Sequence, residues 1–291
     1  MFGKVLLPTD FSPDSQRVLE YVKDLPGVQE VVLLHIIDAT RPSLRGWEHG
    51  PKIENAKILM EENRQVLEKG GTPARVVVET LVDPITQGTV TLAILNKAEA
   101  CDVSLIMIGA RGRNAIREIL LGSVSAGVVR SARTPVLLMR FPPGAAAIEK
   151  RPRLFSRILV PVDFSDLSRN AFSHIPHSPA PDNVILLHVV DKGESEEEIQ
   201  AAVRDAKKNL EAMEKDPALA GLSVTSRVHV GYPPDEIIAT ADREDVTLIL
   251  MSPQGEGWTR ELRTLFLGST TNAVVRRAAR PVLITAGSRA A

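Results

Sequence analysis

Short apolar runs and longer amphipathic stretches alternate along the chain. In the first half, the apolar runs lie at 4–8, 30–36, 74–81, 104–108 and 135–139. They are continuous instead of alternating with polar residues, which is typical of parallel strands buried on both faces. The amphipathic stretches predict helices at 13–24, 52–69, 85–100 and 123–132. Because helical crossovers join parallel strands, this order predicts an α/β fold.

The same order of parts occurs twice. "GKVLLPTDFSPDSQRVLEYV" at 3–22 resembles "SRILVPVDFSDLSRNAFSHI" at 156–175, and "VVLLHIID" resembles "VILLHVVD". Further on, "LLGSVSAGVVRSARTPVLLM" resembles "FLGSTTNAVVRRAARPVLI". A repeated order of elements indicates a repeated structural unit. We therefore expect two tandem doubly wound domains, each a five-stranded parallel sheet with helices on both faces.

A change of composition separates the two copies. "RFPPGAAAIEKRPRLF" at 140–155 combines Pro-Pro-Gly, three alanines and basic residues, which is typical of a linker with turn and polyproline character. The predicted domains are therefore residues 1–142 and 156–291, with a linker at 143–155.

Composition narrows the classes of partner. The 291 residues include 35 Lys and Arg against 36 Asp and Glu, a net charge of −1, so no overall field attracts nucleic acid or an anionic membrane. The single Cys101 excludes a disulfide within the chain and a paired-cysteine zinc motif. No stretch has the length of a membrane span, and the N-terminus lacks the apolar core of a signal peptide. We expect a cytoplasmic protein with no nucleic-acid or membrane partner.

Candidate chemistry gathers where the strands end. In doubly wound sheets, ligands bind beyond the carboxyl ends of the strands, at the point where the crossovers diverge. The residues predicted there in the first copy are Pro8, Thr9, Asp10, Ile36, Asp38 and 109–112. Ser12 and Pro13 predict the start of a helix without needing Asp10 as its cap. Asp10 is then either a loop stabiliser that accepts nearby amides or a carboxylate that binds hydroxyl or amino groups of a ligand.

Three glycines precede the last helix of the first copy. Glycine permits positive φ and lets backbone N–H groups approach an anion, and a helix N-terminus adds unpaired donors. The amides of Ser123 and Val124, the Ser123 hydroxyl, and the charges of Arg111 and Arg113 could therefore hold a phosphate. Alternatively, the glycines only turn the chain and allow close packing. The sequence matches neither a Walker A motif nor the Gly-x-Gly-x-x-Gly fingerprint.

These residues resemble the nucleotide-binding branch of the universal stress protein family. Its pattern of Gly, two residues, Gly, nine residues, Gly and Ser or Thr is present at Gly109, Gly112, Gly122 and Ser123. Pro-Thr-Asp at 8–10 and "LLHIID" at 33–38 are also similar to the family. The resemblance implies a strand order of 3-2-1-4-5 and a bound adenine nucleotide, ATP or AMP, with or without magnesium. It also implies an intrachain pseudo-dimer through the fifth strands, and further pairing into a homo-oligomer.

The resemblance also implies the site residues. Asp10 and Ile36 would contact the adenosine, with Pro8, Thr9, Ile108 and Gly109 beside it, and the phosphates would lie against Gly112, Gly122, Ser123 and Val124. The corresponding residues of the second copy are Asp163, Val189, Met251, Gly255, Gly268, Ser269 and Thr270.

The second copy departs from the glycine pattern. Ser252 replaces the first glycine, and twelve residues instead of nine separate Gly255 from Gly268. Glu256 adds a negative charge, which disfavours a triphosphate. We expect a weakened, altered or empty second site that could still accept a monophosphate.

Three functions remain open. The favoured one is a nucleotide-binding stress or regulatory protein without efficient catalysis, because no positioned pair of nucleophile and base is evident. His35 and His188 are expected to pack at strand ends, and Pro176 between His174 and His177 disfavours a metal site. The alternatives are a slow ATP hydrolase or phosphotransferase, and a scaffold that binds a partner protein without a ligand.

Overall fold

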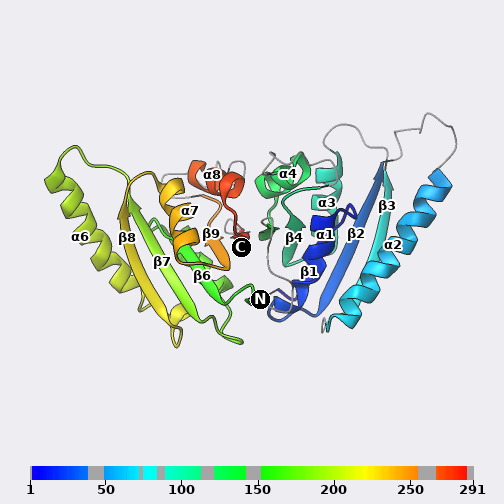
Figure 1. The fold of residues 1–291 in the computed structure, drawn as a ribbon, viewed down its shortest axis with the longest axis horizontal. Coiled ribbons are helices and arrows are strands. Elements are labelled where there is room, and N and C mark those ends of the chain that lie inside the picture. The colour runs from blue at the N-terminus through cyan, green and yellow to red at the C-terminus, as the bar shows by residue number, and fades with distance from the viewer. Residues whose placement is uncertain are drawn as a thin grey trace. The chain divides into compact units, whose positions relative to one another are not determined.

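The computed structural model describes residues 2–38, 49–71, 75–83, 89–112, 121–141, 152–254 and 267–286. The chain divides into two compact units, Met1–Met139 and Arg140–Ala291. Each unit has strands and helices in alternation, which confirms the predicted α/β class (Figure 1). None of the helices in the described ranges combines the length and the apolar character that crossing a membrane requires.

The first unit is a parallel five-stranded sheet. Its elements are β1 (Lys4–Pro8), α1 (Pro13–Leu19), the 3₁₀ turn η1 (Val22–Asp24), β2 (Glu30–Asp38), α2 (His49–Lys69), β3 (Arg75–Asp83), α3 (Thr89–Ala100), β4 (Leu105–Gly109), α4 (Ser123–Ser131) and β5 (Val136–Met139). The strands lie in the order β3-β2-β1-β4-β5, and each neighbouring pair is parallel. This is the order that the family resemblance implies.

The second unit repeats this sheet. Its elements are β6 (Arg157–Pro161), α5 (Asp166–Asn170), η3 (Ala171–His174), β7 (Asn183–Val190), α6 (Glu196–Met213), η4 (Pro217–Leu219), β8 (Val224–Val230), α7 (Pro233–Arg243), β9 (Leu248–Met251), α8 (Ser269–Arg277) and β10 (Val282–Ile284). The order is β10-β9-β6-β7-β8, again with parallel pairs.

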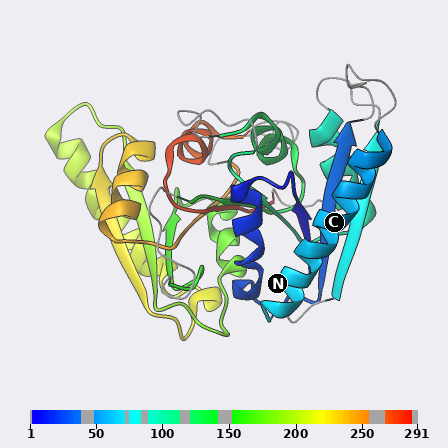
Figure 2. The same ribbon diagram turned by 45° about the vertical axis from the view of Figure 1, so that its right-hand side comes forward.

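Helices cover both faces of each sheet (Figures 1 and 2). In the first unit α1 packs against α2, and α3 packs against α4. The first two crossovers run from β1 toward β3, and the later two run back toward β5. Because such crossovers are right-handed, the two pairs of helices lie on opposite faces. The chain therefore leaves β1 and β4 in opposite directions, which makes their carboxyl ends the switch point of the sheet.

The central strands form the core, as their continuous apolar runs predict. Every residue of β4, β5 and β9 is buried. Leu33, Ile106 and Leu186 have essentially no exposed surface. Burying one such side chain contributes about 1.5–3 kcal/mol, so these strands hold the carboxyl ends in fixed positions.

Helix boundaries differ from the prediction mainly at α1. The α-helix ends at Leu19, not at residue 24, and the chain continues through η1. The amides of Glu20 and Tyr21 bond to carbonyls three residues back, at 3.3 and 3.1 Å, and this pattern tightens the helix into 3₁₀ turns. The prediction of a single helix over 13–24 is therefore wrong in its second half.

The other boundaries differ by a few residues. Helix α2 begins at His49 instead of residue 52, and β3 spans Arg75–Asp83 instead of 74–81. Helix α3 is described from Thr89, and the predicted start at 85 lies outside the described residues. Of the predicted linker, the structure describes 152–155, where Leu154 and Phe155 are buried.

Candidate functional site

The turn after β1 holds Asp10 at the carboxyl edge, which we define as the edge of each sheet where its strands end. The Thr9 amide donates to the Leu34 carbonyl at 2.8 Å, so the pairing with β2 continues past Pro8. The Asp10 carboxylate then accepts the Ser12 amide at 3.0 Å. Asp10 is therefore a loop stabiliser, as one interpretation of the sequence proposed. Its contact with a ligand stays a prediction.

Ser12 caps the helix that follows. Its hydroxyl accepts the Ser15 amide at 3.2 Å, and Pro13 occupies the first helical position, as predicted. Between Asp10 and this cap, Phe11 has a left-handed backbone with φ of 60°. A bulky residue seldom adopts this conformation, which costs about 1–2 kcal/mol and requires support from its surroundings.

His35 supplies that support from β2. Its ring lies 4.3 Å from the Phe11 ring, centroid to centroid. Its Nδ1 lies 2.8 Å from the Thr9 carbonyl oxygen, and because a carbonyl only accepts, this nitrogen donates the hydrogen. His35 packs at the strand end as predicted, and it fastens the turn that carries Asp10. Ile36, the next residue, is half-buried.

Helix α4 is tied to the end of β4. The Gly122 amide donates to the Ala110 carbonyl at 2.7 Å, and the buried Ser125 hydroxyl donates to the Gly109 carbonyl at 2.7 Å. Gly122 is the N-cap of α4 and provides no side-chain cap. The first-turn amides of Ser123 and Val124 therefore have no side-chain acceptor at the cap, and a helix start of this kind attracts anions.

The three glycines of the pattern lie where a side chain would come close to neighbouring atoms. None of Gly109, Gly112 and Gly122 has a left-handed φ, so the positive φ that glycine permits is not used at these positions. A Cβ on Gly112 would lie 2.6 Å from an Asp10 carboxylate oxygen. A Cβ on Gly122 would lie 3.4 Å from the Ala110 carbonyl oxygen and 3.9 Å from the Gly112 amide nitrogen. The start of α4, the loop after β4 and Asp10 therefore converge, as the switch-point argument predicts.

Asp14 adds a second carboxylate to this edge. Burial raises the pKa of Asp14 above its ordinary value near 3.8. The positive charges of Arg111 and Arg17 oppose that rise, and the Asp10 charge adds to it. The carboxyl edge thus carries charges of both signs. The predicted contribution of Arg113 lies outside the described residues.

The second unit builds the same turn after β6. The Val162 amide donates to the Leu187 carbonyl at 2.8 Å, and Asp163 accepts the amide and the hydroxyl of Ser165 at 3.1 and 2.6 Å. Phe164 has φ of 65°. Its ring lies 4.3 Å from that of His188, whose Nδ1 lies 2.9 Å from the Val162 carbonyl. Both turns therefore rely on the same pair of rings.

The loop after β9 differs from the loop after β4. The Ser252 hydroxyl donates to the Gln254 carbonyl at 2.8 Å, and the Gln254 side chain is only 2% exposed. Arg111, at the position corresponding to Gln254, is half-buried. The predicted site residues Gly255 and Glu256 lie outside the described residues, whereas Gly268, Ser269 and Thr270 form the start of α8. The second unit thus has a serine and a buried amide where the first unit has Gly109 and the half-buried Arg111.

Sequence reasoning missed the side chains that fix both loops. In the second unit the Thr271 hydroxyl donates to the Ser252 carbonyl at 3.0 Å, as Ser125 does to Gly109. The recurrence of a hydroxyl residue at matching positions of the two copies was the signal that could have found them.

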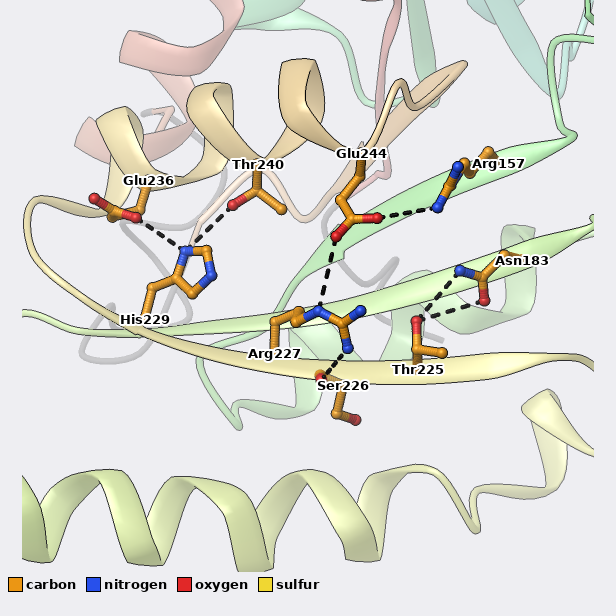
Figure 3. Close-up of polar contacts among 9 residues, drawn as sticks. All are labelled: Arg157, Asn183, Thr225, Ser226, Arg227, His229, Glu236, Thr240 and Glu244. Carbon is orange, nitrogen blue, oxygen red and sulfur yellow. Dashed lines mark hydrogen bonds and ion pairs between the residues drawn. The ribbon is translucent and has the colours of Figure 1, made fainter.

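The second unit also has a cluster of polar and charged side chains between β8 and α7 (Figure 3). His229 Nδ1 lies 2.9 Å from a Glu236 oxygen and 3.3 Å from the Thr240 hydroxyl. Both partners approach the same ring nitrogen, so the ring does not bridge an acid and a nucleophile as in a catalytic triad. Glu244 bonds to Arg157 at 3.0 Å, and Arg227 lies 3.8 Å from its other oxygen. These contacts join α7 to the sheet.

In the described ranges, no three His, Cys, Asp or Glu side chains are grouped closely enough to hold a metal ion. His177 Nε2 lies 3.0 Å from the Ala218 carbonyl, and His174 Nδ1 lies 3.2 Å from the Ser173 hydroxyl. Each of these histidines thus has a hydrogen-bond partner within the second unit.

Fold and site together define a tandem protein of two doubly wound α/β units, with a capped turn and a helix start meeting at the switch point of the first. The chain belongs to the universal stress protein family, whose sequence profile matches residues 1–140 and 154–286.

Known relatives share either one unit or the whole chain. Universal stress protein MJ0577 of Methanocaldococcus jannaschii is 31% identical over 48% of this chain and 96% of its own length. A universal stress protein of Mycolicibacterium smegmatis is 23% identical over 96% of both chains. The crystal structure of a universal stress protein from Archaeoglobus fulgidus has a TM-score of 0.69 and 28% identity, covering 97% of this chain and 95% of that one.

Proposed function

We propose that this chain is a stress or regulatory protein that binds one adenine nucleotide, ATP or AMP, tightly in its first unit. The observation that carries the proposal is the convergence at one switch point of Asp10, the glycine segment 109–112 and the α4 start at Gly122. The family to which the chain belongs supports it, since this glycine pattern is typical of its nucleotide-binding branch.

Each part of the first unit has a role in this proposal. The second Asp10 oxygen, on the side of Gly112, would accept hydrogen bonds from the ribose or base, and half-buried Ile36 would contact the base. Backbone amides at Gly112, Ser123 and Val124 would hold the phosphates, because a helix start supplies both donors and partial positive charge. Magnesium bound with the phosphates would reduce their charge.

Binding without efficient turnover is part of the proposal. Asp10 is held in the turn by the Ser12 amide, an arrangement that suits a fixed acceptor. Phosphoryl transfer depends on a positioned nucleophile and on stabilisation of charge in the transition state. The cytoplasmic location and the pairing of whole chains, which the sequence analysis anticipates, stay predictions.

Gly122→Val tests the nucleotide site directly. A side chain at this position would lie near the Gly112 amide, over the donors that would face the phosphates, and its nearest backbone contact of 3.4 Å is an ordinary one. Since φ at Gly122 is −70°, valine fits the backbone. We expect ATP affinity to fall by at least about tenfold, or 1.4 kcal/mol, while thermal unfolding changes little.

Isothermal titration calorimetry of the full chain with ATP and AMP is the measurement, and Gly268→Val in the second unit is the matched control. If tight binding survives Gly122→Val and is lost in Gly268→Val, the tight site lies in the second unit and the proposal is contradicted. Two equal sites per chain would contradict the proposed difference between the units.

A further inference from the structure

Two charged side chains at the proposed nucleotide site have neutral counterparts in the second unit. Asp14 is the second residue of α1, and Arg111 lies between Gly109 and Gly112. The corresponding residues of the second unit are Leu167 and Gln254. An acid and a base thus differ together between the two copies. The acid and the base at these two positions are therefore both specific to the first unit.

The geometry brings these two residues together across Gly109. A Cβ on Gly109 would lie 3.5 Å from the Arg111 carbonyl oxygen and 3.7 Å from Asp14 Cβ. The start of α1 and the loop after β4 therefore both come close to Gly109. The Arg111 charge acts on Asp14, because it opposes the rise in the Asp14 pKa that burial produces. The neighbouring carboxylate of Asp10 contributes a second negative charge to the same edge.

We propose that Asp14 sets the ligand charge that the first unit prefers, by offsetting the positive charge of Arg111. The site then favours adenine nucleotides of low negative charge, such as AMP or magnesium-bound ATP, over metal-free ATP. This inference rests on the proposed nucleotide site. Two charges about 8 Å apart near water change affinity by roughly two- to threefold, so each added phosphate charge is disfavoured by about that factor.

Removing the Asp14 charge tests the inference. Asp14→Asn keeps the shape of the side chain, and Glu20→Gln removes the same charge at the opposite end of α1. Calorimetric titration of the full chain would use adenosine, AMP, metal-free ATP and magnesium-bound ATP as ligands. In Asp14→Asn we expect affinity to rise about thirtyfold for metal-free ATP with its four charges, about sixfold for AMP and magnesium-bound ATP with two, and not at all for adenosine. Glu20→Gln leaves all four affinities unchanged.

Equal changes for all four ligands, or no change, would overturn the inference, because Asp14 would then act through local structure or not at all. If the wild type binds nucleotides and Asp14→Asn leaves the order of the four affinities unchanged, this inference alone is wrong. If the wild type binds no nucleotide, the proposed function is wrong as well. If Asp14→Asn does not fold, Arg111→Gln provides the opposite change. Its affinity falls most for metal-free ATP and stays constant for adenosine, and a uniform fall would overturn the inference.

Discussion

The two units share the turn after their first strand and differ in the loop after their fourth. In the turn after the first strand, Asp10 and Asp163 each accept the amide two residues further on. Phe11 and Phe164 both adopt a left-handed backbone. In the loop after the fourth strand, Gly109 and the half-buried Arg111 of the first unit correspond to Ser252 and the buried Gln254 of the second. One edge of a duplicated fold can therefore stay constant while the other edge diverges.

The largest expected effect comes from moving the serine of the second unit into the first. In Gly109→Ser the new Cβ fits, with its nearest contact 3.5 Å from the Arg111 carbonyl oxygen. The hydroxyl would then donate to that carbonyl, as Ser252 donates to Gln254. We expect ATP affinity to fall by about tenfold or more, equivalent to 1.4 kcal/mol, as measured by calorimetry.

Ser252→Gly is the reciprocal control for that substitution. It removes the hydroxyl that donates to the Gln254 carbonyl and should leave the ATP affinity of the proposed site in the first unit unchanged. Unaltered ATP affinity in Gly109→Ser would show that the serine does not explain the difference between the units.

A loss of stability of equal size in both units is expected from removing the hydroxyls that the units share. Ser125 and Thr271 are both buried, and each donates to a carbonyl at the end of a strand. Ser125→Ala and Thr271→Val remove the donor and leave that carbonyl without its hydroxyl. Each should lower the free energy of unfolding by about 1–3 kcal/mol, measured by urea denaturation. A loss in only one unit would show that the two loop anchors are not equivalent.

The smallest effects concern pH, and they have opposite signs in the two units. Burial raises the pKa of Asp14, so its contribution to stability is present below its ordinary pKa near 3.8 and is lost as pH rises through the raised value. Burial lowers the pKa of His174, so its contribution is present above its ordinary pKa near 6.5 and is lost as pH falls through the lowered value.

Urea denaturation across these two pH windows measures both effects. Asp14→Asn should flatten the acidic dependence only, and His174→Gln should flatten the dependence below pH 6.5 only. If neither substitution alters the dependence of stability on pH, that dependence arises from other titratable groups.

The sequence predicted the sheets because their strands carry continuous apolar runs that only a doubly covered parallel sheet would bury. It predicted the carboxyl edge because Asp10 and Gly109 each follow such a run. It did not predict the end of α1 at Leu19, since Val18, Val22 and Leu25 keep a helical spacing of apolar residues through the 3₁₀ turn. Nor did it predict the left-handed backbone of Phe11, because that conformation depends on a ring from another strand.

The left-handed turn after the first strand has the same support in both units. An unfavourable backbone conformation, held by an aromatic residue and a histidine from the neighbouring strand, occurs at the same place in both copies. Replacing His35 or His188 would remove the ring that packs on the neighbouring phenylalanine, so the cost of the left-handed backbone would no longer be offset in that unit.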